Sequence, residues 1–114
     1  IKDANKFESE SMKKVGLIGE IAPRYRTTYF AHIFSGGYSS GYYSYVHAAV
    51  LDSDAFEAFK EAGDVFDPNL SSKLRSSIYS MGSTEEAMDL FVKFRGRKAV
   101  IEPLLKVRGL DGSE

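Results

Sequence analysis

Residues 67–96 read DPNLSSKLRSSIYSMGSTEEAMDLFVKFRG, and this stretch decides the fold class. Asp67 is a favoured N-cap residue, and Pro68 follows it at the position where a helix best tolerates proline. Apolar residues then recur at the spacing of one buried helical face, at Leu70, Leu74, Ile78 and Met81. We therefore predict a helix that begins at Pro68 and ends at Gly82.

The same stretch predicts a second helix. Ser83 followed three residues later by Glu86 is a capping-box pattern, so this helix is expected to open at Ser83. Its inner face would carry Ala87, Phe91 and Phe94, and Gly96 would end it. Toward the C-terminus, residues 102–108 predict a last helix that buries Leu104 and Leu105 and stops at Gly109.

A long helix is predicted on the N-terminal side of this stretch. Its inward stripe would consist of Tyr42, Tyr45, Val46, Ala49 and Val50. Asp52 or Ser53 could cap a second helical piece that carries Ala55, Phe56 and Phe59 and ends at Gly63.

The first 41 residues give weaker signals. Residues 1–9 are polar and are expected to be frayed, and Ser11 is expected to cap a short helix that ends at Gly16. Aromatic residues and threonines in residues 24–34 are compatible with a strand, but a short helix capped by Thr27 or Thr28 is the reading we favour. Residues 35–41 predict a loop. The chain should therefore be all-α, a helical lobe with one loop rich in glycine and tyrosine.

Composition narrows the possible functions. The chain has 114 residues, the length of one domain, and its formal net charge of -1 argues against nucleic acid or an anionic membrane as a partner. It has no cysteine, which excludes disulfides, cysteine-ligated metals and thiol nucleophiles, and which fits a cytoplasmic location while leaving the periplasm open. No apolar run approaches the roughly 18 residues of a membrane span.

The candidate site is the segment between Tyr25 and Tyr45, which holds six of the seven tyrosines and His32. Phenol and imidazole groups can hydrogen-bond a peptide carbonyl or an oxyanion as charge develops on it. The adjacent Gly36 and Gly37 would let the backbone approach a ligand or let the loop move. The alternative is that these tyrosines are amphipathic packing residues with solvated tips, and the residues alone leave both possibilities open.

Residues 23–45 resemble the C-terminal region of the thimet oligopeptidase and peptidyl-dipeptidase family of zinc metallopeptidases. The resemblance rests on His32-Ile33-Phe34-Ser35-Gly36-Gly37-Tyr38, whose spacing is that of the bacterial peptidyl-dipeptidase branch, and on Tyr42-Tyr43-Ser44-Tyr45. It continues through residues 54–56, 94–97, 103–105 and 108–110.

The resemblance implies an enzyme that releases dipeptides from the C-termini of oligopeptides. It implies that His32 and Tyr45 hydrogen-bond the substrate carbonyl and the oxyanion, and that Tyr42 helps to stabilise the transition state. Tyr38, with Gly36 and Gly37, would bind and position the peptide, whereas Tyr25 and Tyr79 are assigned no part in catalysis. The alternative is a non-catalytic helical module that binds peptides or a partner.

This sequence departs from the family in its metal ligands. It contains no HExxH motif, and its two histidines, His32 and His47, are too few for a catalytic zinc site. We therefore expect residues 1–114 to be a single C-terminal segment of a larger metallopeptidase, with the zinc ligands upstream of Ile1. Alone, the chain should be inactive, bind no catalytic zinc, and be able to self-associate through the face that the rest of the polypeptide covers.

Two smaller expectations complete the sequence reading. His47 stands where the family usually has tryptophan, and we expect it to be a packing substitution on the long helix. Arg95, Arg97 and Lys98 form a small basic cluster, which is expected to be a solvated helix end.

Overall fold

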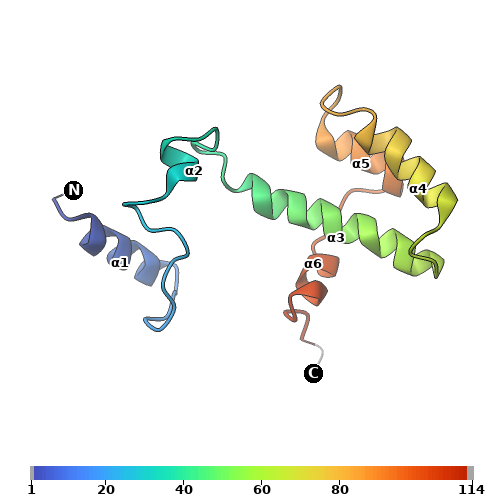
Figure 1. Ribbon diagram of the computed structural model, residues 1–114. Helices are drawn as coiled ribbons and strands as arrows, with labels where there is room; N and C mark the ends of the chain where they lie inside the picture. The colour runs from blue at the N-terminus through green and yellow to red at the C-terminus, as the bar shows by residue number, and fades with distance from the viewer. Residues whose placement is uncertain (1, 113–114) are drawn as a thin grey trace. The chain divides into compact units, whose positions relative to one another are not determined.

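The computed structural model describes residues 2–112, and every regular element in that range is a helix (Figure 1). The predicted all-α class is therefore confirmed. The chain divides into two compact units, one up to Tyr43 and one from Ser44 onward. None of the described helices is both long enough and apolar enough to cross a membrane.

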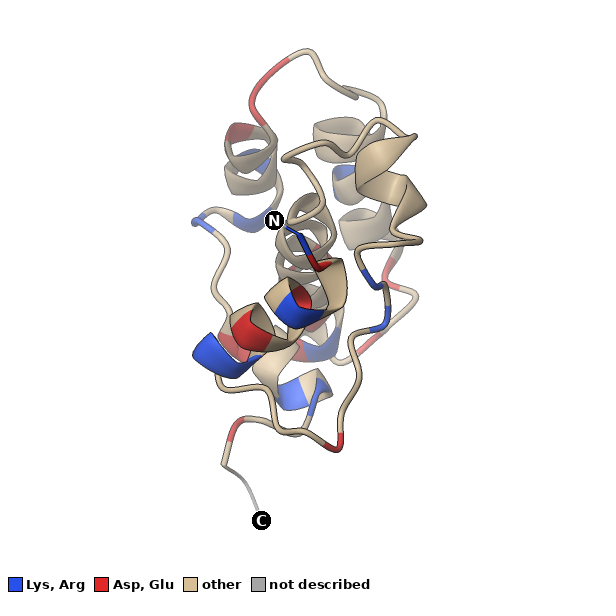
Figure 2. Cartoon of the chain, turned by 90° about the vertical axis from the view of Figure 1, so that its left-hand side faces the viewer, with Lys and Arg blue, Asp and Glu red and all other residues tan. Residues whose placement is uncertain are grey.

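The first unit contains α1 (Ala4–Lys14) and α2 (Ala31–Phe34). Helix α1 begins where the Asp3 carboxylate accepts a hydrogen bond of 3.0 Å from the amide of Lys6. Acidic and basic residues are mixed along this helix (Figure 2). Two lysines lie in its last turn, where their positive charges interact favourably with the negative end of the helix dipole. The expected fraying of residues 1–9 is thus wrong from Ala4 onward, and Ile1 lies outside the described residues.

The threonine and serine caps predicted in this unit are also wrong. Ser11 lies inside α1 and donates to the carbonyl of Phe7 at 2.8 Å. Helix α2 confirms the helical reading of this segment, but it begins after Phe30 without a side-chain cap. Thr27 instead uses both its amide and its hydroxyl to bind Glu8. Residues 35–43 then form turns that lead to the second unit.

The second unit contains α3 (Ser44–Ala62), α4 (Pro68–Leu74), the π-helix η1 (Arg75–Tyr79), α5 (Ala87–Arg95) and α6 (Glu102–Val107). Helix α3 packs against α5 and α6, and α5 packs against η1. Ala58, Phe59 and Phe94 form the core cluster, against which Ala55, Leu70, Leu74 and Ile78 pack. All the fully buried apolar side chains of the described residues belong to this unit.

The helix ends predicted around residues 67–96 are partly confirmed. Asp67 caps α4, because its carboxylate accepts from the amides of Asn69 and Leu70, each at 2.8 Å. Gly96 ends α5 in the left-handed conformation, with a φ of 78°. The Ser83 capping box is wrong: α5 begins only after Glu86, and the neighbouring Glu85 is instead paired with Lys93.

Helix α3 differs most from its prediction. It runs without a break through Asp52 and Ser53, and its buried residues are Asp54, Ala58 and Phe59. Tyr45 and Val46, predicted to face inward, are 48% and 54% exposed. Ala49 and Val50 of the same predicted stripe are half-buried, because the packing of this unit is centred on the second half of α3.

Candidate functional site

Five rings of the first unit form one cluster, which we call the ring cluster: Tyr25, Phe30, His32, Tyr38 and Tyr42. The His32 imidazole centroid lies 6.0 Å from the ring of Tyr38 and 5.6 Å from that of Tyr42. The two tyrosine rings are 6.5 Å apart and nearly perpendicular. Three of the residues chosen from the sequence are therefore brought together. Aromatic pairs at these distances stabilise one another and limit ring rotation.

The structure adds two rings that the sequence did not assign to the site. Tyr25, expected to have no part in it, lies 5.0 Å from His32 and stacks on Phe30 at 5.1 Å. Phe30 in turn meets the Tyr42 ring at 4.8 Å, edge to face. No local sequence pattern places either residue in the ring cluster, because the contacts depend on how residues 24–43 fold back on themselves.

Gly36 is required by the turn that follows α2. A side-chain carbon at this position would lie 3.0 Å from the carbonyl oxygen of His32, closer than about nine in ten such contacts in proteins. The same carbonyl accepts a hydrogen bond of 3.3 Å from the amide of Tyr38. A carbon added at Gly37 would meet nothing within 4 Å. Gly36 thus lets the chain return Tyr38 to His32, whereas Gly37 is not needed for packing.

Two hollows adjoin these residues. One of about 530 Å³ is lined by Phe30, Ile33, Phe34, Tyr38, Ser39, Ser40, Tyr42 and Tyr43. The other, of about 250 Å³, is lined by Ala31, His32, Ser35, Gly36 and Tyr38. Tyr38 borders both and is 37% exposed, so the ring cluster presents phenol groups beside open space. Such groups can donate hydrogen bonds to a carbonyl or an oxyanion.

A carboxylate of α1 holds the segment that carries Tyr25. Glu8 is only 9% exposed, and its two oxygens accept from Arg26 Nε and from the amide of Thr27, each at 2.8 Å. The Thr27 amide and the Arg26 guanidinium together hold the pKa of Glu8 below its ordinary value. The charged form of Glu8 therefore fixes the residues next to Tyr25.

Tyr45 and His47 lie in the second unit, on the first two turns of α3. Tyr45 is half exposed, and its proposed cooperation with His32 and Tyr42 stays a prediction. His47 is exposed, so it fills no packing space inside its own unit. Among residues 2–112 no group of three histidine, aspartate or glutamate side chains is placed to hold a metal ion.

A buried ion-pair network, missed in the sequence, lies in the second unit. Asp54 is fully buried and accepts from Arg97 Nη1 at 2.6 Å, Arg97 Nη2 at 2.7 Å, Arg95 Nε at 3.2 Å and the amide of Val100 at 2.9 Å. Arg95 also makes a two-fold contact with Glu61 at 2.6 and 2.7 Å. The expectation that these arginines form a solvated helix end is therefore wrong.

The pKa of Asp54 follows from these contacts. Burial alone would raise it, but the hydrogen bonds from Arg97, from the Val100 amide and from Arg95 outweigh burial, so the pKa lies below its ordinary value. A signal existed in the sequence, because Asp54 sits between Leu51, Ala55 and Ala58 on the buried stripe of α3. A carboxylate in such a stripe requires cationic partners.

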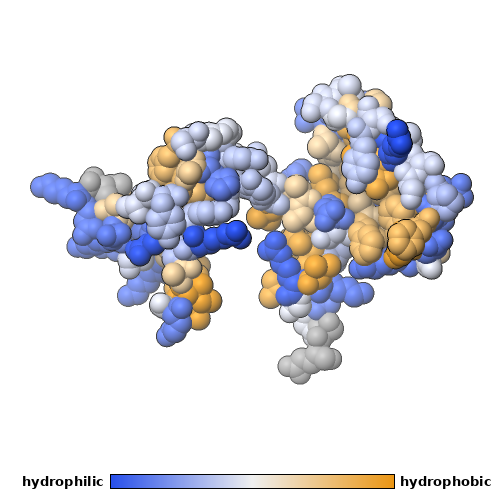
Figure 3. All heavy atoms as spheres, viewed as in Figure 1, coloured by the Kyte–Doolittle hydropathy of each residue, from blue (hydrophilic) through white to orange (hydrophobic). Residues whose placement is uncertain are grey.

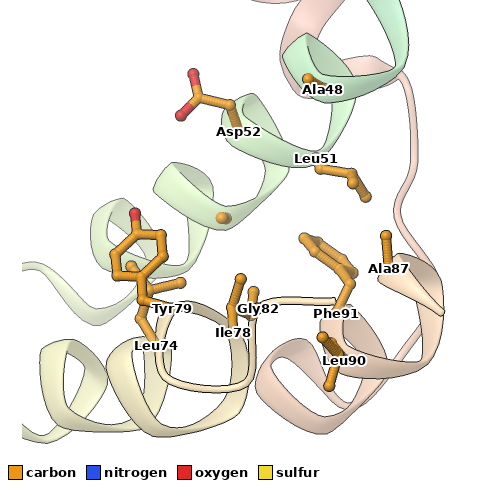
Figure 4. A pocket seen from close by; sticks show the side chains of 11 residues that line it. Ala48, Leu51, Asp52, Leu74, Ile78, Tyr79, Gly82, Ala87, Leu90 and Phe91 are labelled. Carbon is orange, nitrogen blue, oxygen red and sulfur yellow. The ribbon is translucent and has the colours of Figure 1, made fainter. Parts of the chain in front are cut away.

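The second unit also has an apolar cavity of about 340 Å³ between α3, η1 and α5. Figure 4 shows Leu51, Ile78 and Phe91 converging on it, while the carboxylate of Asp52 points away.

Apolar side chains also reach the surface of both units (Figure 3), among them Phe34 at 69% and Phe66 at 85% exposure. Tyr29, Tyr38 and Tyr43 are exposed as well, whereas Phe30 and Tyr42 are half-buried in the ring cluster.

Several known proteins are similar in sequence to most of this chain. Dipeptidyl carboxypeptidase of Salmonella typhimurium is 37% identical over 106 residues, which cover 92% of this chain and 15% of that protein. Dipeptidyl carboxypeptidase of Escherichia coli is 37% identical over 112 residues, 97% of this chain and 16% of that protein. Oligopeptidase A of Escherichia coli is 46% identical over 83 residues, 73% of this chain and 12% of that protein.

The chain thus spans only 12% to 16% of the length of these relatives. The sequence pattern of one protein family nevertheless matches residues 2–110, which are nearly the whole chain. The resemblance seen around His32 and Tyr38 is confirmed by this match, and the chain belongs to peptidase family M3.

Proposed function

We propose that this chain is the C-terminal segment of a zinc metallopeptidase that releases dipeptides from the C-termini of oligopeptides. This segment would form the wall of the active-site cleft that binds the peptide and stabilises the oxyanion. The observation that carries the proposal is the ring cluster, which gathers His32, Tyr38 and Tyr42 beside the close turn at Gly36. Membership of a peptidase family gives these donors a substrate with carbonyl groups to bind.

Dipeptide release is proposed because the two dipeptidyl carboxypeptidases match more than nine-tenths of the chain. The relatives named oligopeptidase A are more identical over a shorter stretch, so hydrolysis of oligopeptides without dipeptide release is the alternative outcome to test. Mass spectrometry of the products from one oligopeptide separates the two outcomes, since only the first produces the C-terminal dipeptide of the substrate.

Zinc would come from ligands elsewhere in the polypeptide, because the described residues offer no three-ligand group. A bound zinc ion polarises a carbonyl and activates water. This chain's own residues would do three things. Tyr38 would position the peptide, His32 would donate to its carbonyl, and Tyr45 with Tyr42 would donate to the oxygen on which negative charge develops.

The test uses the polypeptide that contains this chain. Tyr45→Phe removes one donor that acts mainly in the transition state, so we expect turnover to fall about 100-fold or more, about 3 kcal/mol, with little change in KM. Tyr38→Phe should instead raise KM, because its contact is also made in the ground state. Tyr79→Phe, in an exposed residue of the second unit, is the matched control.

Unchanged turnover in Tyr45→Phe would remove the oxyanion role from this proposal. Peptide binding without hydrolysis, in a protein that retains zinc, would favour the alternative of a non-catalytic binding module. Melting temperatures of all variants are compared, because a defect that only follows lost stability would point to packing rather than chemistry.

A further inference from the structure

We propose that Tyr25, stacked on Phe30, is a positioning residue that orients the His32 imidazole and the Tyr42 phenol. The consequence for catalysis rests on the function proposed above, whereas the positioning itself rests on the ring geometry alone. Tyr25 borders neither of the two hollows described above, and Phe30 borders only the one beside Tyr42, so the action of Tyr25 would pass through the rings that it contacts.

The stacked pair meets both candidate donors. Tyr25 and Phe30 lie nearly parallel, with an angle of 15° between their planes. Tyr25 contacts the rings of His32 at 5.0 Å and Tyr42 at 6.2 Å, and Phe30 contacts the same two rings at 6.3 Å and 4.8 Å. A turn of either donor ring would therefore collide with one of the pair or lose an edge-to-face contact.

The backbone next to Tyr25 is held in place. The two following residues, Arg26 and Thr27, make three hydrogen bonds to Glu8 of α1, at 2.8, 2.8 and 3.1 Å. On the other side, the guanidinium carbon of Arg24 lies 5.4 Å from the centre of the Tyr25 ring. The chain that follows Tyr25 is thus anchored and a guanidinium lies over its ring, so the ring can support other rings.

The contacts of Tyr25 in this cluster are ring contacts. Phenylalanine at this position would keep the stacking face and lose only the hydroxyl, whereas leucine would remove the ring. The proposal therefore predicts that Tyr25→Phe behaves like the wild type and that Tyr25→Leu does not. Tyr29→Leu is the matched control, since Tyr29 is 56% exposed and lies only four residues away.

The first experiment needs no activity. The chain has only two histidines, so its proton NMR spectrum has two imidazole Hε1 signals, which a His47→Gln variant assigns. We expect a nuclear Overhauser contact between the rings of Tyr25 and His32 in the wild type, and a His32 signal displaced from that of the exposed His47. Tyr25→Leu should move the His32 signal, and Tyr25→Phe and Tyr29→Leu should leave it in place. A wild type without the contact, or a His32 signal that Tyr25→Leu leaves unmoved, would overturn the proposal.

The second experiment measures peptide hydrolysis by the polypeptide that contains this chain. Misplacing a catalytic group by about 1 Å can lower the rate about 100-fold. Tyr25→Leu should therefore lower kcat by roughly 10- to 100-fold, whereas Tyr25→Phe should keep the kcat of the wild type. If Tyr45→Phe and His32→Gln impair turnover and Tyr25→Leu does not, the positioning role is refuted and the proposed function stands. If all three are silent while the NMR result holds, the ring geometry is right and the proposed function fails.

Discussion

Replacing Asp54 by asparagine should strongly destabilise the second unit. The side chain is fully buried, and it accepts hydrogen bonds from Arg95, Arg97 and the Val100 amide. Asparagine has nearly the same shape, so no cavity is created. It keeps one acceptor oxygen, but it loses the negative charge and turns an NH₂ group toward the guanidinium groups.

The size of the loss can be worked from these contacts. Removing one partner of a buried ion pair costs about 3–5 kcal/mol. Arg97 is 41% exposed, so water compensates part of its charge, and this places the expected loss near the lower limit of about 3 kcal/mol. A unit of this size is stable by roughly 4–10 kcal/mol, so the variant should lose about a third or more of its free energy of unfolding.

The assay is urea denaturation at pH 7, followed by far-ultraviolet circular dichroism. Asp52→Asn is the control, because Asp52 is an exposed carboxylate on the same helix. The reasoning would be refuted by a loss in Asp54→Asn below about 1 kcal/mol, the size expected of an exposed pair.

Two further predictions follow from other contacts. Gly36→Ala should lower the melting temperature, or alter the NMR signals of His32, because the new carbon would press on the His32 carbonyl at 3.0 Å, whereas Gly37→Ala should be silent in both measurements. Acid should weaken the fold, because Glu8 and Asp54 have pKa values below their ordinary values of 4.5 and 3.8, so the stability that they contribute is complete above those values and is lost as the pH falls through the lower folded values. Urea midpoints between pH 7 and pH 3 measure this second effect, and a Glu8→Gln variant as acid-sensitive as the wild type would contradict the part assigned to Glu8.

The features that the sequence predicted well are those encoded locally. Asp67 caps α4 because its partners are the amides two and three residues ahead, and Gly96 ends α5 because glycine accepts the left-handed conformation without strain. His32 and Tyr38 could be expected to lie close together because the turn between them is only a few residues long.

The features that the sequence missed depend on distant contacts. Asp54 meets its arginines and the Val100 amide across 41 to 46 residues of chain. Its place in a buried stripe indicates that it needs cationic partners, but not which residues supply them. The exposure of Tyr45 and Val46 on α3 was missed for the same reason. Tyr45 has the apolar character of an inward residue, but burial is decided by which later helix reaches that turn. Ser83 and Glu86 fit a capping box, yet Glu85 is paired with Lys93, and the helix begins later.

The uneven burial of the two units has a consequence for hydrogen exchange. The only buried side chain among the described residues of the first unit is Glu8, whereas the second unit buries Phe59, Phe91 and Phe94. Amides in regions with few buried apolar contacts exchange through local opening, at a lower free energy than global unfolding. Amides near Tyr38 should therefore take up deuterium well before those of α3 and α5. The turns around Tyr38 would then open locally many times while the amides of α3 and α5 stay protected.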